Sequence, residues 1–260
     1  MLVYPQLESG ALSQFPVLKN RRTRTVINRA ADGSTIRLTD PAAETTEWQL
    51  TYVDLSDSEA ATLRAFFDCA EGSLNGFCFL DPTGNLLAWS ERLDHEVWQK
   101  DPLLSLGDGI ADPVSGTAAW RLSNSGGGEQ SIGQTIAGPG AYQYCFSAYV
   151  RSDSPANVTM SIAGRATSRA VGREWSRVWV TANGEADGTS VRFALGIAAG
   201  SAVEAFGIQV EAQCAASGYK ASTRGGVYEA AHLGEDVLTI SRTGANRQSC
   251  TVTIIHAKHL

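Results

Sequence analysis

The 260-residue sequence predicts a mainly β protein with a small β-rich domain that contains one helix and an antiparallel β-sandwich inserted into it. Helical periodicity is confined to residues 56–72. From about residue 87, short candidate strands alternate with clusters of Gly, Ser, Asn and Asp, which is typical of an all-β sandwich. The C-terminal part returns to the earlier pattern. We therefore expect a discontinuous domain formed by residues 1–86 and 225–260, with residues 87–224 as the sandwich.

The N-terminal part predicts an extended arm followed by strands. Residues 1–20 are apolar but interrupted by prolines and a glycine, which indicates an extended segment. The β-branched residues 23–28 and the alternating residues 34–39 flank an Ala-Asp-Gly-Ser turn, so we expect a hairpin there. Residues 48–54 alternate between apolar and polar side chains and predict one more strand.

One helix is expected next. Ser56 is an N-cap candidate, and Glu59 follows three residues later, which is the spacing of a capping box. Gly72 stands where a helix C-terminus favours a residue with positive φ. The apolar face consists of Leu63, Phe66 and Phe67.

The inserted segment predicts seven strands, each rich in β-branched or aromatic residues and bounded by turn residues. They cover residues 118–122, 130–135, 142–151, 157–162, 176–181, 190–197 and 203–211. After the sandwich, residues 236–241 and 249–256 predict a hairpin. A lone hairpin is marginal in water, so we expect this one to pair with the N-terminal strands.

Charge and hydropathy exclude some function classes. The net charge of −6 argues against a nucleic-acid-binding face. No window has the roughly 18 apolar residues that a membrane helix needs, and the N-terminus does not resemble a signal peptide, so we expect no membrane insertion. The short basic run Arg21, Arg22 and Arg24 is interpreted as a solvated loop or a subunit contact.

The sequence contains no strong signal for a metal, a cofactor or catalysis. The five cysteines are widely spaced without a CxxC pair, so we expect reduced thiols, buried at Cys78 and Cys145, and no zinc site. GxSxG and HExxH motifs are absent. We therefore expect no catalytic residues and no cofactor. A structural calcium held by Asp108, Asp112 and Glu211 is one open alternative.

Two further questions concern exposed acids and tryptophans. A small glycan hydrolase would need paired carboxylates, and the candidate pairs are Asp94 with Glu96, Asp108 with Asp112, and Glu235 with Asp236.

Sugar rings stack on exposed indoles. Trp98, in a loop-like segment, is the candidate for an exposed glycan-binding platform. The other tryptophans of predicted strands are expected in the core: Trp120, Trp175 and Trp179.

The middle of the chain resembles the carbohydrate-binding-module-like sandwiches that are common in phage tail proteins. The resemblance implies a sandwich of jelly-roll type and covers about half of the chain. Its motifs, in order, are Asn85–Glu91, Trp98, Asp112-Pro113, Ala118–Leu122, Gln134, Tyr144–Arg151, Trp175–Val178, Gly207–Glu211 and Tyr219.

The flanking parts resemble distal tail and baseplate proteins of long-tailed phages, which have relatives in gene transfer agents and prophages. The motifs are Phe15-Pro16, Trp48–Tyr52, Ser58-Glu59, Phe66 and Gly76–Pro82. This resemblance implies a non-enzymatic virion tail protein, assembled in the host cytoplasm as a trimeric or hexameric ring. Its partners would be other tail and baseplate proteins and a host-surface glycan. The alternatives are a free glycan-binding, lectin-like protein and the small glycan hydrolase.

Overall fold

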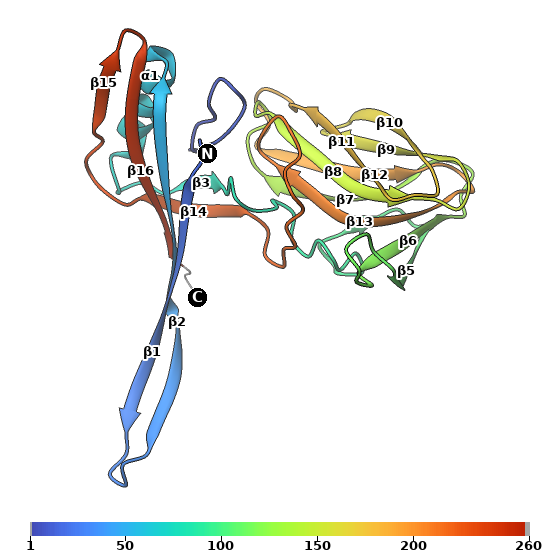
Figure 1. Ribbon diagram of the computed structural model, residues 1–260, viewed down its shortest axis with the longest axis horizontal. Coiled ribbons are helices and arrows are strands. Elements are labelled where there is room, and N and C mark those ends of the chain that lie inside the picture. The colour runs from blue at the N-terminus through green and yellow to red at the C-terminus, as the bar shows by residue number, and fades with distance from the viewer. Residues whose placement is uncertain (1, 258–260) are drawn as a thin grey trace. The chain divides into compact units, whose positions relative to one another are not determined.

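The computed structural model describes residues 2–257 and divides the chain into two compact units (Figure 1). The first unit, which we call the base unit, consists of Met1–Leu7, Ser13–Phe79 and Tyr228–Leu260. The second, the sandwich unit, consists of Glu8–Leu12 and Leu80–Val227. The expected sandwich began at residue 87 and ended at residue 224. The sandwich unit therefore starts earlier, ends later and includes a short N-terminal segment.

The base unit is a six-stranded sheet with one helix. The strands follow the order β1-β2-β16-β14-β3, and β15 pairs with β16 beside β14. The elements are β1 (Val17–Arg29), β2 (Thr35–Leu55), α1 (Asp57–Ala70), β3 (Phe77–Leu80), β14 (Val227–Leu233), β15 (Ile240–Gly244) and β16 (Arg247–Ala257). Because β16 pairs with β2 over most of its length, the C-terminal strand joins the N-terminal sheet, as expected.

The hairpin β1–β2 extends beyond the rest of this sheet as a two-stranded ribbon (Figure 1). β16 pairs only with residues 45–55 of β2, so the part nearer the turn has no third strand. The two expected segments 34–39 and 48–54 are thus one long strand. The basic run Arg21, Arg22 and Arg24 lies in β1 and not in a loop, which corrects that expectation.

Helix α1 begins with the expected capping box. The side chain of Ser56 accepts a hydrogen bond from the backbone N–H of Glu59, and the Glu59 carboxylate accepts one from the backbone N–H of Ser56. The helix ends at Glu71, which has a positive φ, and Gly72 follows with φ +64°. The apolar face of α1 packs on the sheet, in a core that includes Trp48, Phe66 and Phe79.

The N-terminal segment is not an extended arm. Tyr4 is 1% exposed, packs edge-on against Phe66, and its hydroxyl lies 2.9 Å from that of Tyr52. Leu12 is equally buried in the sandwich unit. Tyr4 and Leu12 therefore belong to the cores of the two units, whereas Phe15 (72%) and Leu18 (54%) are exposed.

The sandwich unit has two antiparallel five-stranded sheets that enclose an apolar core, which confirms the expected mainly β architecture. The β12 sheet has the order β10-β9-β12-β7-β4, and the β8 sheet has the order β11-β8-β13-β6-β5. The strands are β4 (Gln99–Lys100), β5 (Leu104–Ile110), β6 (Ala119–Asn124), β7 (Gln130–Ala137), β8 (Tyr144–Arg151), β9 (Ala156–Ile162), β10 (Arg165–Val171), β11 (Ser176–Ala182), β12 (Ser190–Ile197) and β13 (Ala202–Glu211). All seven expected strands are present, and β4, β5 and β10 are additional.

Candidate functional site

The outer face of the β8 sheet carries the candidate site. Alternate residues of β8 (Tyr144, Phe146, Ala148 and Val150) are fully buried between the sheets, so Tyr149 and Arg151 point outward. Arg177 of β11 lies opposite Tyr149, and Trp179 lies opposite Ser147, which places both on the same outer face. Trp179 is 46% exposed, whereas Val180 beside it is buried.

Two arginines of this face lie over aromatic rings. The guanidinium carbon of Arg151 is 4.7 Å from the centre of the Trp175 ring, and that of Arg177 is 5.3 Å from the centre of Tyr149. Arg151 also donates to Glu204 of β13 at 2.6 Å. These contacts fix planar donors next to planar rings. We call the set Tyr149, Arg151, Trp175, Arg177 and Trp179 the aromatic–arginine face.

The segment 213–222, which we call the strap, covers the adjoining part of the same sheet. Tyr219 packs on Phe206 with ring centres 5.0 Å apart. Gln209 accepts a hydrogen bond from the backbone N–H of Lys220 at 2.7 Å. Ser147 of β8 also points outward but is fully buried, and its hydroxyl accepts a hydrogen bond from Arg177, which also donates to the strap carbonyl of Ser217.

Glu211 anchors the strap and is 4% exposed. Its carboxylate accepts hydrogen bonds from the N–H and hydroxyl of Ser217 and pairs with the Lys220 ammonium at 3.2 Å. Burial alone would raise the pKa of Glu211, but the hydrogen bonds from Ser217 and the Lys220 charge lower it overall. The Lys220 ammonium also contacts the Ser217 hydroxyl. Because Lys220 is held by the Glu211 carboxylate, we interpret this contact as structural and not as a catalytic base beside a nucleophile.

The expectation that Trp98 is an exposed platform is wrong. Trp98 is 6% exposed, and its indole N–H donates to the backbone carbonyl of Trp89 at 2.9 Å. The core position expected for Trp120 is confirmed, because this residue is 7% exposed and donates to the carbonyl of Glu91. Trp175 and Trp179 were also expected in the core. Trp175 is half-buried, and the outward direction of Trp179 overturns that expectation.

The acids considered for hydrolysis have structural contacts. Asp94 pairs with Arg92 through two hydrogen bonds of 2.9 Å, and this contact lowers its pKa. Asp236 accepts from the N–H and hydroxyl of Ser73. Burial would raise the pKa of Asp112, but hydrogen bonds from three backbone N–H groups within residues 114–118 lower it. These carboxylates organise loops and helix ends.

The suggested calcium ligands Asp108, Asp112 and Glu211 are not brought together. Among residues 2–257, no group of three or more His, Cys, Asp or Glu side chains is arranged to hold a metal ion. Asp112 and Glu211 already accept hydrogen bonds from their own loops.

The cysteines are free thiols. Cys78 and Cys145 are buried, as expected, and so is Cys250. Burial raises the pKa of Cys78 to about 11, of Cys145 to about 12 and of Cys250 to about 11. These three side chains are therefore inert apolar groups of the cores.

The arginines expected at a subunit interface each pair with an acid across the β1–β2 hairpin. The contacts are Arg21–Glu44 at 2.6 Å, Arg22–Glu47 at 3.1 Å and Arg24–Asp40 at 3.6 Å. The arginine side chains are nevertheless about two-thirds exposed, at 66–69%. Within the described part of the chain, no helix is long and apolar enough to cross a membrane.

Neither a family model nor a curated protein matches the chain. Solved structures match about half of it. The C-terminal family 22 carbohydrate-binding module of Clostridium thermocellum Xyn10B has 12% identity and a TM-score of 0.41, with 54% of this chain and 99% of that chain covered. The CBM22-1 xylan-binding domain of Paenibacillus barcinonensis Xyn10C has 11% identity and a TM-score of 0.37, with 54% and 95% covered.

A third match is the enzymatically active domain of tailspike protein 4 from bacteriophage CBA120. It has 13% identity and a TM-score of 0.38, and the match covers 51% of this chain. The chain spans 22% of the length of that tailspike domain. All three TM-scores are low, so these similarities assign no function to this chain.

Proposed function

We propose that the sandwich unit binds carbohydrate through the aromatic–arginine face. The observation that carries this proposal is the exposure of Trp179, which is 46% although it stands in the middle of a strand. A large flat ring costs free energy when it is left in water, and such exposed apolar groups mark binding surfaces when polar groups surround them. Sugar rings offer both an apolar face for the indole and hydroxyl groups for the arginines.

The arginines supply directional donors beside the ring. Arg151 is fixed by Glu204 and Trp175, and Arg177 by the strap carbonyl of Ser217 and the hydroxyl of Ser147. Because these side chains are already ordered, binding would cost little additional side-chain entropy. Trp175 and Trp179 are four residues apart, about 13 Å along an extended strand, so the face suits a chain of several sugars more than a single one.

The test is a glycan array probed with the wild-type protein and with Trp179→Ala. We expect the wild type to bind a subset of oligosaccharides and Trp179→Ala to lose at least about tenfold in affinity, or about 1.4 kcal/mol. Phe15→Ala is the matched control, because Phe15 is an exposed aromatic (72%) in the base unit. Equal glycan binding by the wild type, Trp179→Ala and Phe15→Ala would exclude the aromatic–arginine face as the binding site.

A second function, assembly as a virion tail structural protein of distal tail or baseplate type, is supported by a different observation. The β1–β2 ribbon is exposed on both faces in its outer part, and isolated two-stranded ribbons are marginally stable in water. Such a ribbon gains stability when it docks on a neighbouring subunit. Identical subunits that contact each other head to tail form a ring when the rotation between them closes, and we propose a trimer or hexamer here.

In this second proposal the protein is assembled in the host cytoplasm and located in the virion tail. Arg21, Arg22 and Arg24 contact neighbours, other tail and baseplate proteins adjoin the ring, and several sandwich units together bind a host-surface glycan. Weak sites on one ring would then act together. Light scattering over a range of concentrations tests it. A trimer or hexamer supports assembly, and a strict monomer contradicts assembly without a tail template.

A further inference from the structure

The segment formed by β10, β11 and the turn between them carries positive charge that no acid compensates. Residues 165–182 contain four arginines and one acid, Glu174, in a chain whose net charge is −6. The arginines donate to neutral oxygens: Arg165 to the Asn183 side chain, Arg169 to the Trp179 carbonyl, Arg173 to the Asp153 carbonyl and Arg177 to the Ser217 carbonyl. Within the described part of the chain, none of these five charged residues forms an ion pair, whereas arginines of β1, β6 and β8 do.

On the outer face of the β8 sheet, Arg177 is the one charge of strands β6, β8, β11 and β13 that lacks an ion-pair partner among residues 2–257. The other charged residues of these strands are paired: Glu204 with Arg121 and Arg151, Arg121 also with Asp153, and Glu211 with Lys220. The two carboxylates of this face are therefore neutralised already. The positive charge of Arg177 remains.

The guanidinium of Arg177 has donors to spare. Its Nη1 donates to the Ser217 carbonyl, and its Nη2 donates to the Ser147 hydroxyl at 3.0 Å. A guanidinium has five N–H groups, so three of them have no acceptor among the described residues, and one of these, on Nε, is buried. A partly buried cation without a counter-charge costs free energy. The remaining N–H group on each Nη atom can donate to an anionic oxygen.

Arg177 stands beside the exposed indole of Trp179. The two residues are two positions apart on β11 and point to the same side, which separates their Cα atoms by about 7 Å. A second guanidinium lies at the backbone of Trp179, because Arg169 of β10 donates from Nη2 to the Trp179 carbonyl at 3.3 Å. A sugar ring stacked on the indole would therefore have positive charge next to it.

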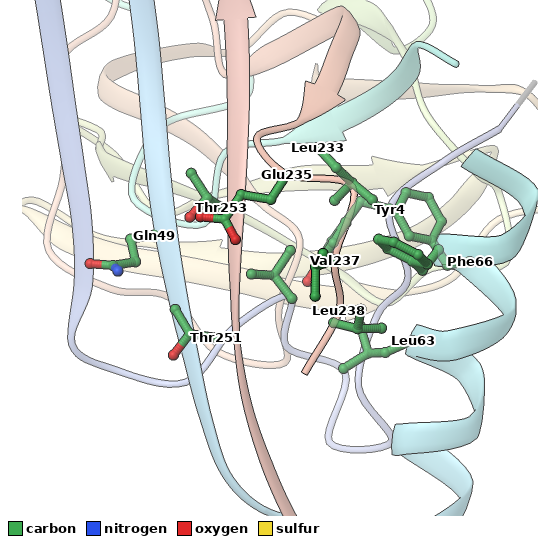
Figure 2. A pocket seen from close by; sticks show the side chains of 12 residues that line it. Tyr4, Gln49, Leu63, Phe66, Leu233, Glu235, Val237, Leu238, Thr251 and Thr253 are labelled. Carbon is green, nitrogen blue, oxygen red and sulfur yellow. The ribbon is translucent and has the colours of Figure 1, made fainter. Parts of the chain in front are cut away.

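The pocket of the base unit has the opposite electrostatic character. It lies beside α1 and has a volume of about 270 Å³, and Figure 2 shows Leu63 and Phe66 of the helix among its lining residues. Among the described residues that line it, Glu235 is the only charged one. A carboxylate repels a negatively charged ligand, so this pocket is not a site for one.

We infer that the aromatic–arginine face binds a negatively charged glycan, with a carboxylate or sulfate group of the sugar at Arg177. This inference rests on the proposed carbohydrate binding and adds the class of ligand to it. The hydroxyl groups of a neutral sugar would leave the guanidinium charge uncompensated. A carboxylate or sulfate compensates it and accepts charge-assisted hydrogen bonds, which are stronger than those between neutral groups.

The first measurement compares charged and neutral forms of the same oligosaccharides by biolayer interferometry. The probes are oligogalacturonides, sialyl-oligosaccharides and carrageenan oligosaccharides, each beside the neutral form made by methyl esterification or desulfation. We expect at least one charged form to bind the wild type about tenfold more tightly than its neutral form, and this preference to weaken as salt is added. A preference for a uronate or sialate identifies a carboxylate as the ligand group, and a preference for carrageenan identifies a sulfate.

Two arginine variants test where the anion lies. Arg177→Gln removes the unpaired charge beside Trp179, and we expect it to abolish the preference for the charged form. Arg192→Gln is the matched control, because Arg192 is also partly exposed and donates to a neutral side chain, that of Gln99, at 2.6 Å. Its neighbours Val191 and Phe193 are buried between the sheets, so Arg192 points to the outer face of the β12 sheet. We expect Arg192→Gln to keep the preference.

The outcomes separate this inference from carbohydrate binding itself. Equal binding of charged and neutral forms by the wild type would overturn the inference and leave carbohydrate binding standing. This comparison needs no substitution, so it does not depend on any effect of Arg177→Gln on the strap. An Arg177→Gln protein that keeps the full preference would also overturn the inference. If no oligosaccharide binds, in these sets or on the array, both proposals fail.

Discussion

Trp179 of β11 lies directly opposite Ser147 of β8, and the two side chains differ completely in exposure. Ser147 is fully buried and accepts a hydrogen bond from Arg177, whereas Trp179 is 46% exposed. Arg177 also donates to the strap carbonyl of Ser217, so the proposed carbohydrate-binding face adjoins the strap.

Two tryptophans with opposite environments give the first prediction. Trp98→Ala removes a side chain that is 6% exposed, and we expect a loss of about 3–5 kcal/mol in the free energy of unfolding. Trp179→Ala should cost less than about 1 kcal/mol, since nearly half of the Trp179 surface (46%) is already in water. Urea denaturation measures both. A larger loss for Trp179→Ala than for Trp98→Ala would contradict the buried position of Trp98 and the exposed position of Trp179.

The second prediction concerns acid stability of the strap. The pKa of Glu211 is lowered in the folded protein, so its carboxylate stabilises the fold fully above the unfolded value of about 4.5. That contribution is lost as the pH falls through the lower folded pKa. We therefore expect hydrogen exchange of the strap amides to increase, relative to the rest of the sandwich, as the solution is acidified below pH 4.5.

Glu211→Gln is the control for this effect. It removes the titrating group, so strap exchange should be faster at neutral pH and should change little on acidification. A strap that stays equally protected in the wild type through the whole acid range would show that Glu211 does not anchor it.

The third prediction tests the glycine on which the strap packs. Gly207 has φ +61°, and a Cβ atom there would lie 3.1 Å from the Cγ atom of Tyr219. Gly207→Ala should cost about 1–2 kcal/mol for the left-handed backbone and an additional amount for the contact with Tyr219. Gly164→Ala isolates the first contribution, because Gly164 has φ +81° and a Cβ atom added to it would meet no other atom within 4 Å. Equal losses in thermal unfolding would exclude the Tyr219 contact.

The fourth prediction concerns the start of α1. Ser56→Ala removes the hydroxyl that accepts the N–H of Glu59, and we expect a loss of about 1 kcal/mol in the stability of the base unit. Ser58→Ala is the matched control, since Ser58 is an exposed serine of the first turn. Chemical denaturation that shows the same stability for both variants would argue against the capping box.

Local signals made much of the fold predictable from the sequence. Ser56 and Glu59 determine the helix start through contacts between neighbouring residues, and the alternation of residues 48–54 matches the buried Trp48, Leu50 and Tyr52. β10 was missed because Arg165–Val171 is an edge strand with mostly exposed residues and no apolar alternation. The gap between β14 and β15 depends on pairing with β16, which no local pattern reveals.

The candidate site was less predictable, because its direction depends on which face of a strand is buried. In β11, Trp179 alternates with Val178 and Val180, and either set could have formed the core. Register with β8 placed the valines inside. Trp98 was assigned to a solvent-facing loop because the partner of its indole, the carbonyl of Trp89, comes from a turn that the sequence alone does not position.

The most direct test of carbohydrate binding at this face is oxidative footprinting of the tryptophans, with and without the strongest glycan from the array. Mass spectrometry then reports the oxidation rate of each indole. We expect Trp179, the most exposed of the described tryptophans, to oxidise fastest alone and to be protected by the bound glycan. A bound glycan that leaves the oxidation rate of Trp179 unchanged would contradict the proposal.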